Sequence, residues 1–262
     1  MRSNILLFIL LGFLNSGICY AQVINVKIGI KDSLLSKTLN ENRQLIVSLP
    51  KDYETYPVLY VLDGNEFSLL EAIMVTWELR AKMIIVAILN TDRDRDMMPL
   101  STPTYEVTNP GAENFLSFIG NELIPHIEKS YRSNGQRTIR GCSLSGLFIM
   151  YAFLEKPELF DNYIGNSAGW YADMNYYFEA LTDKSFKNKD QFNGKKMFVA
   201  NSLIDPFDPQ KEVHIEMLEF FKKVKSELGD RMSSEYITYD NYGHVPYPSF
   251  YDGLKFVLEN KE

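Results

Sequence analysis

The sequence is short of cysteine and has no basic tract. Two cysteines in 262 residues cannot build a disulfide framework, and Cys142 is left without a partner if Cys19 is removed with the N-terminal segment described below. Lys and Arg total 27 against 34 Asp and Glu, a formal charge of −7, so neither nucleic acid nor an anionic membrane is an expected partner. A hydrophobic content of 45% is ordinary for a globular protein and argues against a disordered or multi-span membrane chain.

One apolar run lies at the N-terminus and has the layout of a secretory signal peptide. Arg2 precedes the apolar stretch 5–14, and a small-residue site ends at Ala21. The stretch is too short to span a bilayer. We therefore expect removal of residues 1–21 and export to the periplasm or the medium without a remaining membrane anchor. Residues 22–262 contain no repeat, low-complexity tract or linker, so they are expected to form a single domain.

Segments with strand character alternate with segments of helical periodicity. The run Met83–Leu89 has no polar alternation, which is typical of a strand covered on both faces of a parallel sheet. Apolar residues recur at helical spacing in 115–127, 213–228 and 250–258, and 147–153 is apolar all round, as in a helix buried against a sheet. This alternation predicts α/β architecture. The expected strands are Arg43–Leu49, Pro57–Leu62, Met83–Leu89, Thr138–Arg140, Tyr163–Ile164, Met197–Ala200 and Glu235–Thr238.

The stretch 141–146, Gly-Cys-Ser-Leu-Ser-Gly, stands between an expected strand and the apolar helix. A nucleophile elbow needs a sharp turn at this point, with a strained serine and small residues two positions away on either side. Gly141 and Ser145 hold those places around Ser143, although glycine is usual where Ser145 stands. The N–H of Leu144, at the helix start, would face a developing negative charge. We therefore expect Ser143 to be a nucleophile; the alternative is a plain Ser/Gly turn that begins a helix.

A serine nucleophile needs a base, and the chain has three histidines. His126 and His214 fall in expected helices, whereas His244 stands beside a glycine in a loop after the last expected strand, where a base following the serine belongs. The acid should lie in the loop after the preceding strand. Asp205 is the first candidate and Asp208 the alternative; each is followed by proline, so both could instead be turn or helix-start residues.

Five motifs follow one another along the chain: Pro57–Gly64 (PVLYVLDG), Asn90–Asp96 (NTDRDRD), Glu122–Pro125 (ELIP), Gly141–Gly146 (GCSLSG) and Tyr251–Phe256 (YDGLKF). In order and spacing they resemble the esterase family of α/β-hydrolases, which includes ferric enterobactin esterases, feruloyl and acetyl-xylan esterases, S-formylglutathione hydrolases and the antigen 85 mycolyltransferases. The resemblance runs from about residue 40 to 258 and is greatest to the secreted, siderophore-esterase-like branch. It implies an α/β-hydrolase fold, with a mostly parallel central sheet and helices on both faces.

Residue by residue, the resemblance implies Ser143 as nucleophile, Asp205 as acid and His244 as base. It also implies two oxyanion amides, those of Leu144 and Asn65. The expected reaction is hydrolysis of a carboxylic ester through an acyl-enzyme, without a metal or organic cofactor, on a small-molecule or carbohydrate ester such as a siderophore. Alternatives are acyl transfer with the same triad, peptide hydrolysis, and a non-catalytic binding module.

Two groups of residues are candidates for substrate contact. Arg93 and Arg95 lie in the alternating run 92–96 after a buried strand, where they could hold an anionic substrate group or merely tie the loop together. Trp170 and Tyr171 follow another strand and could form an aromatic wall over the acyl group or belong to the core.

Overall fold

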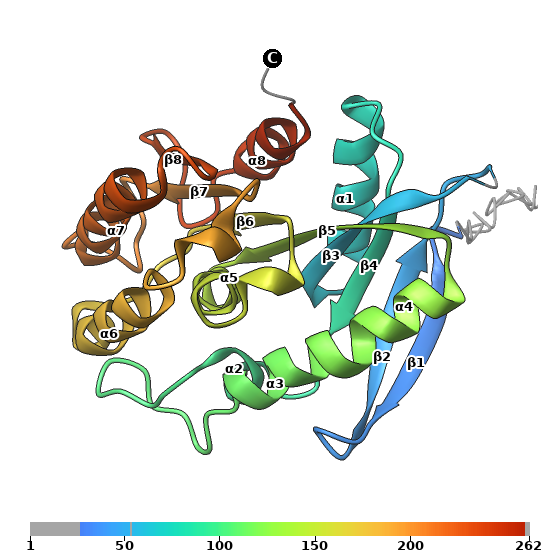
Figure 1. Ribbon diagram of the computed structural model, residues 1–262, viewed down its shortest axis with the longest axis horizontal. Helices are drawn as coiled ribbons and strands as arrows, with labels where there is room; N and C mark the ends of the chain where they lie inside the picture. The colour runs from blue at the N-terminus through green and yellow to red at the C-terminus, as the bar shows by residue number, and fades with distance from the viewer. Residues whose placement is uncertain (1–26, 53, 260–262) are drawn as a thin grey trace, which may run out of the picture.

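The computed structural model describes residues 27–52 and 54–259, so the expected signal peptide lies outside the described part of the chain. A sheet of eight strands forms the centre of that part, in the order β1-β2-β4-β3-β5-β6-β7-β8 (Figure 1). The first two strands of this order run antiparallel to their neighbours, and all pairs from β4 to β8 are parallel. The strands are β1 (Ile30–Ser36), β2 (Glu41–Ser48), β3 (Tyr56–Gly64), β4 (Ile84–Leu89), β5 (Ser133–Cys142), β6 (Asn162–Asn166), β7 (Lys196–Ser202) and β8 (Ser233–Tyr239).

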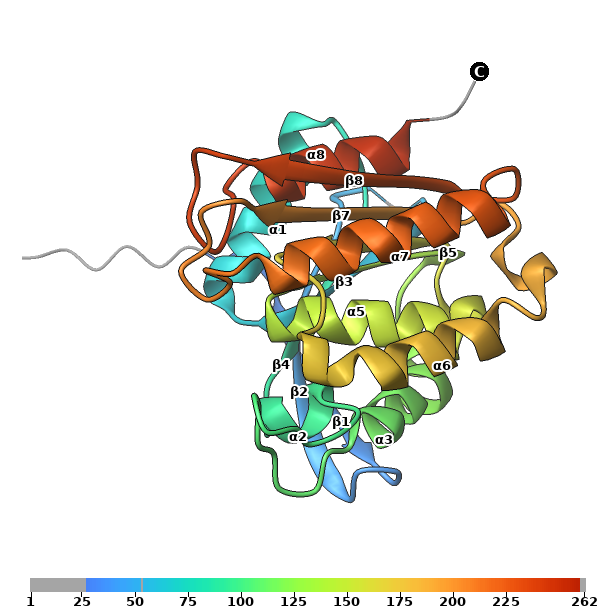
Figure 2. The ribbon, with the colours of Figure 1, turned by 90° about the vertical axis from the view of Figure 1, so that its left-hand side faces the viewer.

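Helices cover both faces of the sheet, as Figures 1 and 2 show. On one face, Leu69 of α1 and Leu254 of α8 pack with Leu59 and Val61 of β3 in one apolar cluster. The remaining helices meet the opposite face in a larger cluster. The expected mostly parallel α/β architecture is confirmed. The helices are α1 (Glu66–Glu78), α2 (Arg93–Met97), α3 (Ala112–Phe118), α4 (Ile124–Ser130), α5 (Leu144–Glu155), α6 (Asn175–Ser185), α7 (Glu212–Leu228) and α8 (Ser249–Leu258).

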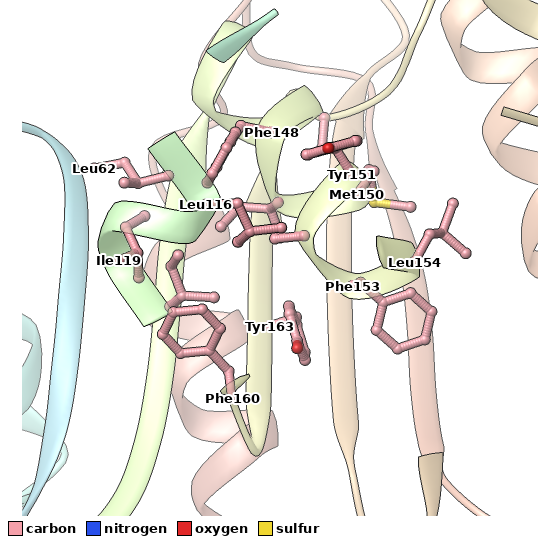
Figure 3. Close-up of a cluster of buried hydrophobic side chains, with 14 of the residues drawn as sticks. Leu62, Leu116, Ile119, Phe148, Met150, Tyr151, Phe153, Leu154, Phe160 and Tyr163 are labelled. Carbon is pink, nitrogen blue, oxygen red and sulfur yellow. The ribbon is translucent and has the colours of Figure 1, made fainter. Parts of the chain in front are cut away.

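The most apolar segments lie where the two layers of helices meet the sheet. The central β4 is buried along nearly its whole length, as its unbroken Ile, Val and Ala composition predicts. Helix α5 is also buried almost throughout and packs against β5 and β6. Figure 3 shows Phe148 and Phe153 of this helix among aromatic and aliphatic side chains, including Phe160 and Tyr163. The rings of Phe153 and Tyr163 meet edge to face, 5.2 Å apart. Because α5 is fixed in this way, so is the turn that leads into it.

Four elements, β1, α1, α2 and α6, were not expected from the sequence, and one expected helix is interrupted. Strand β1 forms the polar outer edge of the sheet, and α1 follows β3 directly. The periodic stretch 115–127 is helical throughout, but a π-helical turn over Ile119–Leu123 separates α3 from α4. All the strands expected from the sequence are present, several of them longer than predicted.

The parallel strands β3, β5, β6, β7 and β8 all end at the same edge of the sheet. The loops that follow them carry Asn65, Ser143, Tyr171, Asp205 and His244, and α/β proteins gather their sites at this edge. None of the helices in the described ranges is both long enough and apolar enough to cross a membrane.

Candidate active site

The turn between β5 and α5 has the geometry of a nucleophile elbow. Ser143 has φ 60° and ψ −122°, a positive-φ conformation that is uncommon for serine and is held here by the chain on both sides. Its N–H donates to the Asn166 carbonyl (2.9 Å), and its own carbonyl accepts the Leu147 N–H (2.9 Å). Position 141 must be glycine, because a Cβ there would lie 2.4 Å from the Ser145 carbonyl oxygen. The strand and the helix therefore approach closely enough to present Ser143 at the edge of the sheet.

Ser143 lines a cavity of about 330 Å³ at this edge. Leu144, Asp205 and His244 line the same cavity, so the structure brings the three expected triad residues and one expected oxyanion residue together. Leu144 is the first residue of α5, so its N–H, like the others of the first helical turn, has no hydrogen-bond acceptor within the helix. Much of the remaining wall is apolar, which suits an uncharged acyl group. The apolar wall includes Met98, Leu147, Met174, Phe207 and Val213.

His244 is held by a carboxylate on one side of its ring. Its Nδ1 lies 2.7 Å from Oδ2 of Asp205, and both side chains are largely buried, at 24% and 11% exposure. The other carboxylate oxygen, Oδ1, accepts the Phe207 N–H at 2.9 Å. The Phe207 ring packs edge to face against the imidazole, with centroids 4.8 Å apart. On the other side of the loop, the Ser167 hydroxyl donates to the His244 carbonyl oxygen. With Nδ1 engaged by Asp205, Nε2 is the nitrogen left to exchange a proton in the cavity.

Asp208, the alternative acid, has a different task. Its two carboxylate oxygens accept the N–H groups of Val213 and His214, both at 3.2 Å. These N–H groups lie in the first turn of α7, so Asp208 acts as a helix cap. The side chain is buried and lies at the cavity wall, but the imidazole is paired with Asp205.

The other two histidines lie in helices, as expected, and have partners away from the cavity. His126 contacts Asp32 of β1 through Nε2 at 2.8 Å. His214 contacts the Tyr236 hydroxyl through Nδ1 at 2.8 Å, and burial lowers the pKa of this imidazole. Neither is placed to serve Ser143.

Asn65, the second expected oxyanion residue, lies at the start of α1 and is not among the residues that line this cavity. Its N–H donates to the Ser68 hydroxyl at 2.9 Å, and its side chain accepts the N–H groups of Phe67 and Ser68. This reciprocal pattern is a capping box. An oxyanion would have to displace the Ser68 hydroxyl before it could use this N–H, so the role of Asn65 stays a prediction.

Arg93 lines the cavity, but its guanidinium is committed to a carboxylate. Nε and Nη2 donate to the two oxygens of Asp63 at 2.7 and 2.9 Å. Burial by itself would raise the pKa of Asp63, but hydrogen bonds from Arg93 and Asn90 and the charge of Arg93 outweigh it and hold that pKa below its ordinary value. Arg93 therefore forms part of the cavity wall as one half of an ion pair and not as an isolated positive charge.

Arg95 and Trp170, the other candidates for substrate contact, are not at the cavity. Arg95 forms an ion pair with Glu41, which attaches α2 to β2, and a second with its neighbour Asp96 in α2. Trp170 is 4% exposed and stacks on Phe178 with centroids 4.2 Å apart, so its ring belongs to the core. Tyr171 does line the cavity, and its hydroxyl donates to the Phe207 carbonyl at 2.9 Å. Burial raises the pKa of this phenol, which keeps it a hydrogen-bond donor.

Three residues near the site, Asp63, Ser167 and Phe207, were not expected there from the sequence. Asp63 and Ser167 both have positive φ, 54° and 46°, at the ends of β3 and β6, and each contacts a neighbouring loop of the site. Phe207 packs on His244. The position of Asp63 and Ser167 immediately at a strand end was the available clue.

Burial raises the pKa of the Cys142 thiol to about 11, so this cysteine is a poor nucleophile beside Ser143.

The described residues contain no group of three or more His, Cys, Asp or Glu side chains arranged to hold a metal ion. The arrangement around Ser143 instead offers a hydroxyl, an imidazole paired with a carboxylate, and the amide of a helix start. Such a set can transfer an acyl group from an ester or amide to the serine and then to water.

Comparison with known proteins gives a consistent result. A family model described as "Putative esterase" matches residues 36–216. Among curated proteins, the ferri-bacillibactin esterase BesA of Bacillus subtilis is 32% identical over 160 residues, covering 49% of this chain and 54% of that protein. A siderophore triacetylfusarinine C esterase of Aspergillus fumigatus is 26% identical over 190 residues, covering 62% and 65%. The matches thus span about half to two thirds of the length of these relatives.

A solved structure of similar fold is that of an IroE-like serine hydrolase from Shewanella oneidensis. It has a TM-score of 0.74 and 29% identity, covering 87% of this chain and 79% of that one. The likeness thus extends over most of both chains. It identifies the architecture as the α/β-hydrolase fold that the motifs predicted.

Proposed function

The chain belongs to this esterase family, and from that premise we propose that it hydrolyses carboxylic esters with Ser143, His244 and Asp205 as a catalytic triad. The observation that carries the proposal is the pairing of His244 with Asp205 at 2.7 Å in the cavity that Ser143 lines. These three side chains come from three different strand ends and line one cavity, which supports the proposal. Buried carboxylate–imidazole pairs of this kind orient a general base.

In the first half of the reaction, Nε2 of His244 takes the proton of Ser143 Oγ as that oxygen attacks the ester carbonyl carbon. The carbonyl oxygen becomes an oxyanion, which the Leu144 N–H and the positive end of α5 stabilise; the Asn65 N–H is the proposed second donor. The tetrahedral intermediate collapses as the ester C–O bond breaks, and His244 gives its proton to the departing alcohol. Asp205 stabilises the imidazolium that exists between these two steps.

In the second half, a water molecule attacks the acyl-enzyme while His244 accepts its proton. Collapse of the second intermediate releases the carboxylic acid and returns the proton to Ser143. No redox change and no group from outside the chain other than water is required. The acid and the alcohol are the two products.

We propose a siderophore ester as the natural substrate. Two curated relatives are named for siderophore ester hydrolysis, in a bacterium and in a fungus. The apolar cavity of about 330 Å³ suits one acyl arm of such a molecule, with the larger remainder outside. An acylated carbohydrate remains the second substrate class to be compared.

We also propose that the protein works outside the cytoplasm. The support is the layout of residues 1–21, in which a charged residue, an apolar stretch and a small-residue site follow one another. On this proposal, residues 22–262 are exported as one domain without a membrane anchor. Edman sequencing of the exported protein should begin at Gln22; an N-terminus at Met1 would contradict it.

The central test is hydrolysis of p-nitrophenyl butyrate by the wild type and by Ser143→Ala. The variant should lose about 10⁴-fold or more in kcat. A serine-directed fluorophosphonate probe should label the wild type and not the variant. A variant that keeps one tenth of wild-type turnover would remove Ser143 from the mechanism. Wild-type protein that neither labels nor turns over would point to a non-catalytic binding module.

Substrate class is tested by comparing kcat/KM for a ferric triscatecholate trilactone and for acetylated xylan. We expect the siderophore ester to exceed the carbohydrate ester by at least tenfold, and the reverse order would overturn that assignment. Adding a sugar alcohol as acceptor tests acyl transfer: hydrolysis predicts free acid as the main product at all acceptor concentrations.

A further inference from the structure

Position 145 is where the elbow motif ordinarily has glycine, and here it carries a fully buried serine. The Ser145 hydroxyl oxygen accepts the Cys142 N–H at 2.7 Å. The same oxygen lies 2.7 Å from Oδ2 of Asp63 and 2.8 Å from the Cys142 carbonyl oxygen. A hydroxyl has one proton to donate, and a carboxylate is a stronger acceptor than a carbonyl. The side chain therefore connects the two sides of the elbow to the end of β3.

Asp63 accepts hydrogen bonds from two separate segments, the stretch 90–93 and the start of α5. Its Oδ1 accepts Nδ2 of Asn90 and Nε of Arg93, both at 2.7 Å, and its Oδ2 accepts Nη2 of Arg93 at 2.9 Å as well as the Ser145 hydroxyl. Asn90 follows β4 and Arg93 begins α2, so one carboxylate joins the loops after β3, β4 and β5. Its backbone adopts φ 54°, which turns the side chain toward this meeting point.

We propose that Asp63 and Ser145 are positioning residues that hold the Ser143 turn in register with the cavity wall. The inference rests on the proposed function and deepens it. It does not require either side chain to touch the substrate. Asp63 acts on the nucleophile through Ser145, two positions along from Ser143, and on the cavity wall through Arg93.

The physical reason lies in the geometry that acyl transfer requires. Ser143 and the Leu144 N–H must keep their positions relative to one carbonyl group, and misplacement by about 1 Å can cost as much as 100-fold in rate. The turn that carries them is strained at Ser143 and fixed on one side by the Asn166 carbonyl. The link from Ser145 to Asp63 fixes the other side. Because its carboxylate is charged and largely buried, this link is stronger than a bond between two neutral groups.

The test uses three substitutions in the full chain. Ser145→Ala removes only the hydroxyl, and Ser145→Gly restores the usual motif without it, so neither adds bulk. Asp63→Asn keeps the shape of the side chain, and asparagine also tolerates positive φ. Its amide NH₂, however, faces hydrogen-bond donors that need an acceptor. The matched control is Ser36→Ala, which removes another buried serine hydroxyl bonded to a backbone N–H, on β1 at the far edge of the sheet.

The readout is kcat per active site, with active sites counted by complete fluorophosphonate labelling, so that any unfolded fraction does not enter the rate. For p-nitrophenyl acetate we expect kcat per site to fall about tenfold in Ser145→Ala, Ser145→Gly and Asp63→Asn, with KM changed less than twofold. Ser36→Ala should lower the thermal midpoint without changing kcat per site.

A merely structural role would give a different pattern. The variants at 145 and 63 would then lose thermal stability, as Ser36→Ala does, while kcat per labelled site stayed within twofold of wild type; that result overturns the proposal. Should Ser145→Ala fail to fold, the smaller Ser145→Gly decides by the same criterion. Failure of the proposed function is recognised separately, because it appears as a wild type that does not turn over or as full activity in Ser143→Ala.

Discussion

Replacing Asp205 with asparagine should abolish the base function of His244 while leaving the fold intact. The reason is visible in the two bonds of the carboxylate: Oδ1 accepts the Phe207 N–H and Oδ2 faces His244 Nδ1. In the variant, the amide oxygen is needed at the Phe207 N–H, which places the NH₂ group against Nδ1. The imidazole must then accept at Nδ1 and carry its proton on Nε2. In that tautomer it cannot take the proton of Ser143.

The size of the effect follows from this tautomer argument. Turning the amide over would restore the productive tautomer, but it would leave the Phe207 N–H facing an NH₂ group, at a cost of about 1–3 kcal/mol. It would also leave the imidazolium without a carboxylate to stabilise it. The two effects together should lower kcat about 10⁴-fold, as loss of a triad acid does elsewhere, which corresponds to about 5.5 kcal/mol in the activation barrier.

Asp208→Asn provides the matched comparison, because the same chemical change is made in the same loop. Asp208 caps α7, and asparagine is also an effective cap, so unfolding should become easier by less than about 1 kcal/mol. Its kcat for p-nitrophenyl butyrate should stay within threefold of wild type. The reasoning is refuted if Asp205→Asn keeps more than one tenth of wild-type kcat, or if Asp208→Asn loses as much activity as Asp205→Asn.

Three further predictions concern stability and are measured by urea unfolding monitored by circular dichroism. Arg43→Leu should destabilise the fold by about 3–5 kcal/mol, because Arg43 is fully buried and its Nη1 pairs with Asp96 at 2.5 Å; a loss below about 1 kcal/mol would contradict this. Gly141→Ala should cost about 3 kcal/mol through the 2.4 Å approach of its Cβ to the Ser145 carbonyl, and a wild-type midpoint would show that the turn can relax. Because folding lowers the pKa of Asp63 from its ordinary value of 3.8, this carboxylate stabilises the fold at pH values above 3.8, and that stabilisation is lost as the pH falls through the folded pKa. The wild type should therefore lose more stability than Asp63→Asn below about pH 4. Parallel acid-unfolding profiles of the two proteins would exclude this contribution.

Most of the strands could be predicted from the sequence because their amino-acid composition reflects their burial. Met83–Leu89 reads as a two-face strand, and β4 is buried on both faces. The edge strand β1 carries Lys31, Asp32 and two serines and has one partner, so its pattern resembles that of a loop. Helix α1 was not predicted because it exposes Phe67, Met74 and Trp77 to solvent in addition to burying one face. Its sequence therefore lacks the polar side that marks an amphipathic helix.

In the candidate site, too, some residues could be predicted from the sequence around them, whereas others depend on contacts with residues far away in the chain. The places of Ser143 and His244 follow from local signals: small residues around a turn, and a glycine-adjacent histidine after the last strand. The sequence could not decide which of Asp205 and Asp208 pairs with the imidazole and which caps α7, because both precede proline in one loop. It depends on which carboxylate faces the imidazole and which faces the start of α7. Likewise Arg95 stands only two positions from Arg93 in α2, yet it pairs with Glu41 of β2 and does not line the cavity.

Asn65 shows why a backbone donor is harder to assign than a side chain. The sequence places it correctly at the end of β3, but its N–H already donates to the Ser68 hydroxyl. One N–H cannot serve that hydroxyl and an oxyanion fully at the same time. Exchanging a neutral acceptor for a charged one is favourable, since bonds to charged groups contribute about 1.5–3 kcal/mol against about 1 kcal/mol for neutral pairs. The Asn65 side chain meanwhile keeps α1 capped through the N–H groups of Phe67 and Ser68. The half of the capping box formed by the Asn65 side chain therefore still holds the helix start when the Asn65 N–H turns to an oxyanion, so the cost to the fold is small.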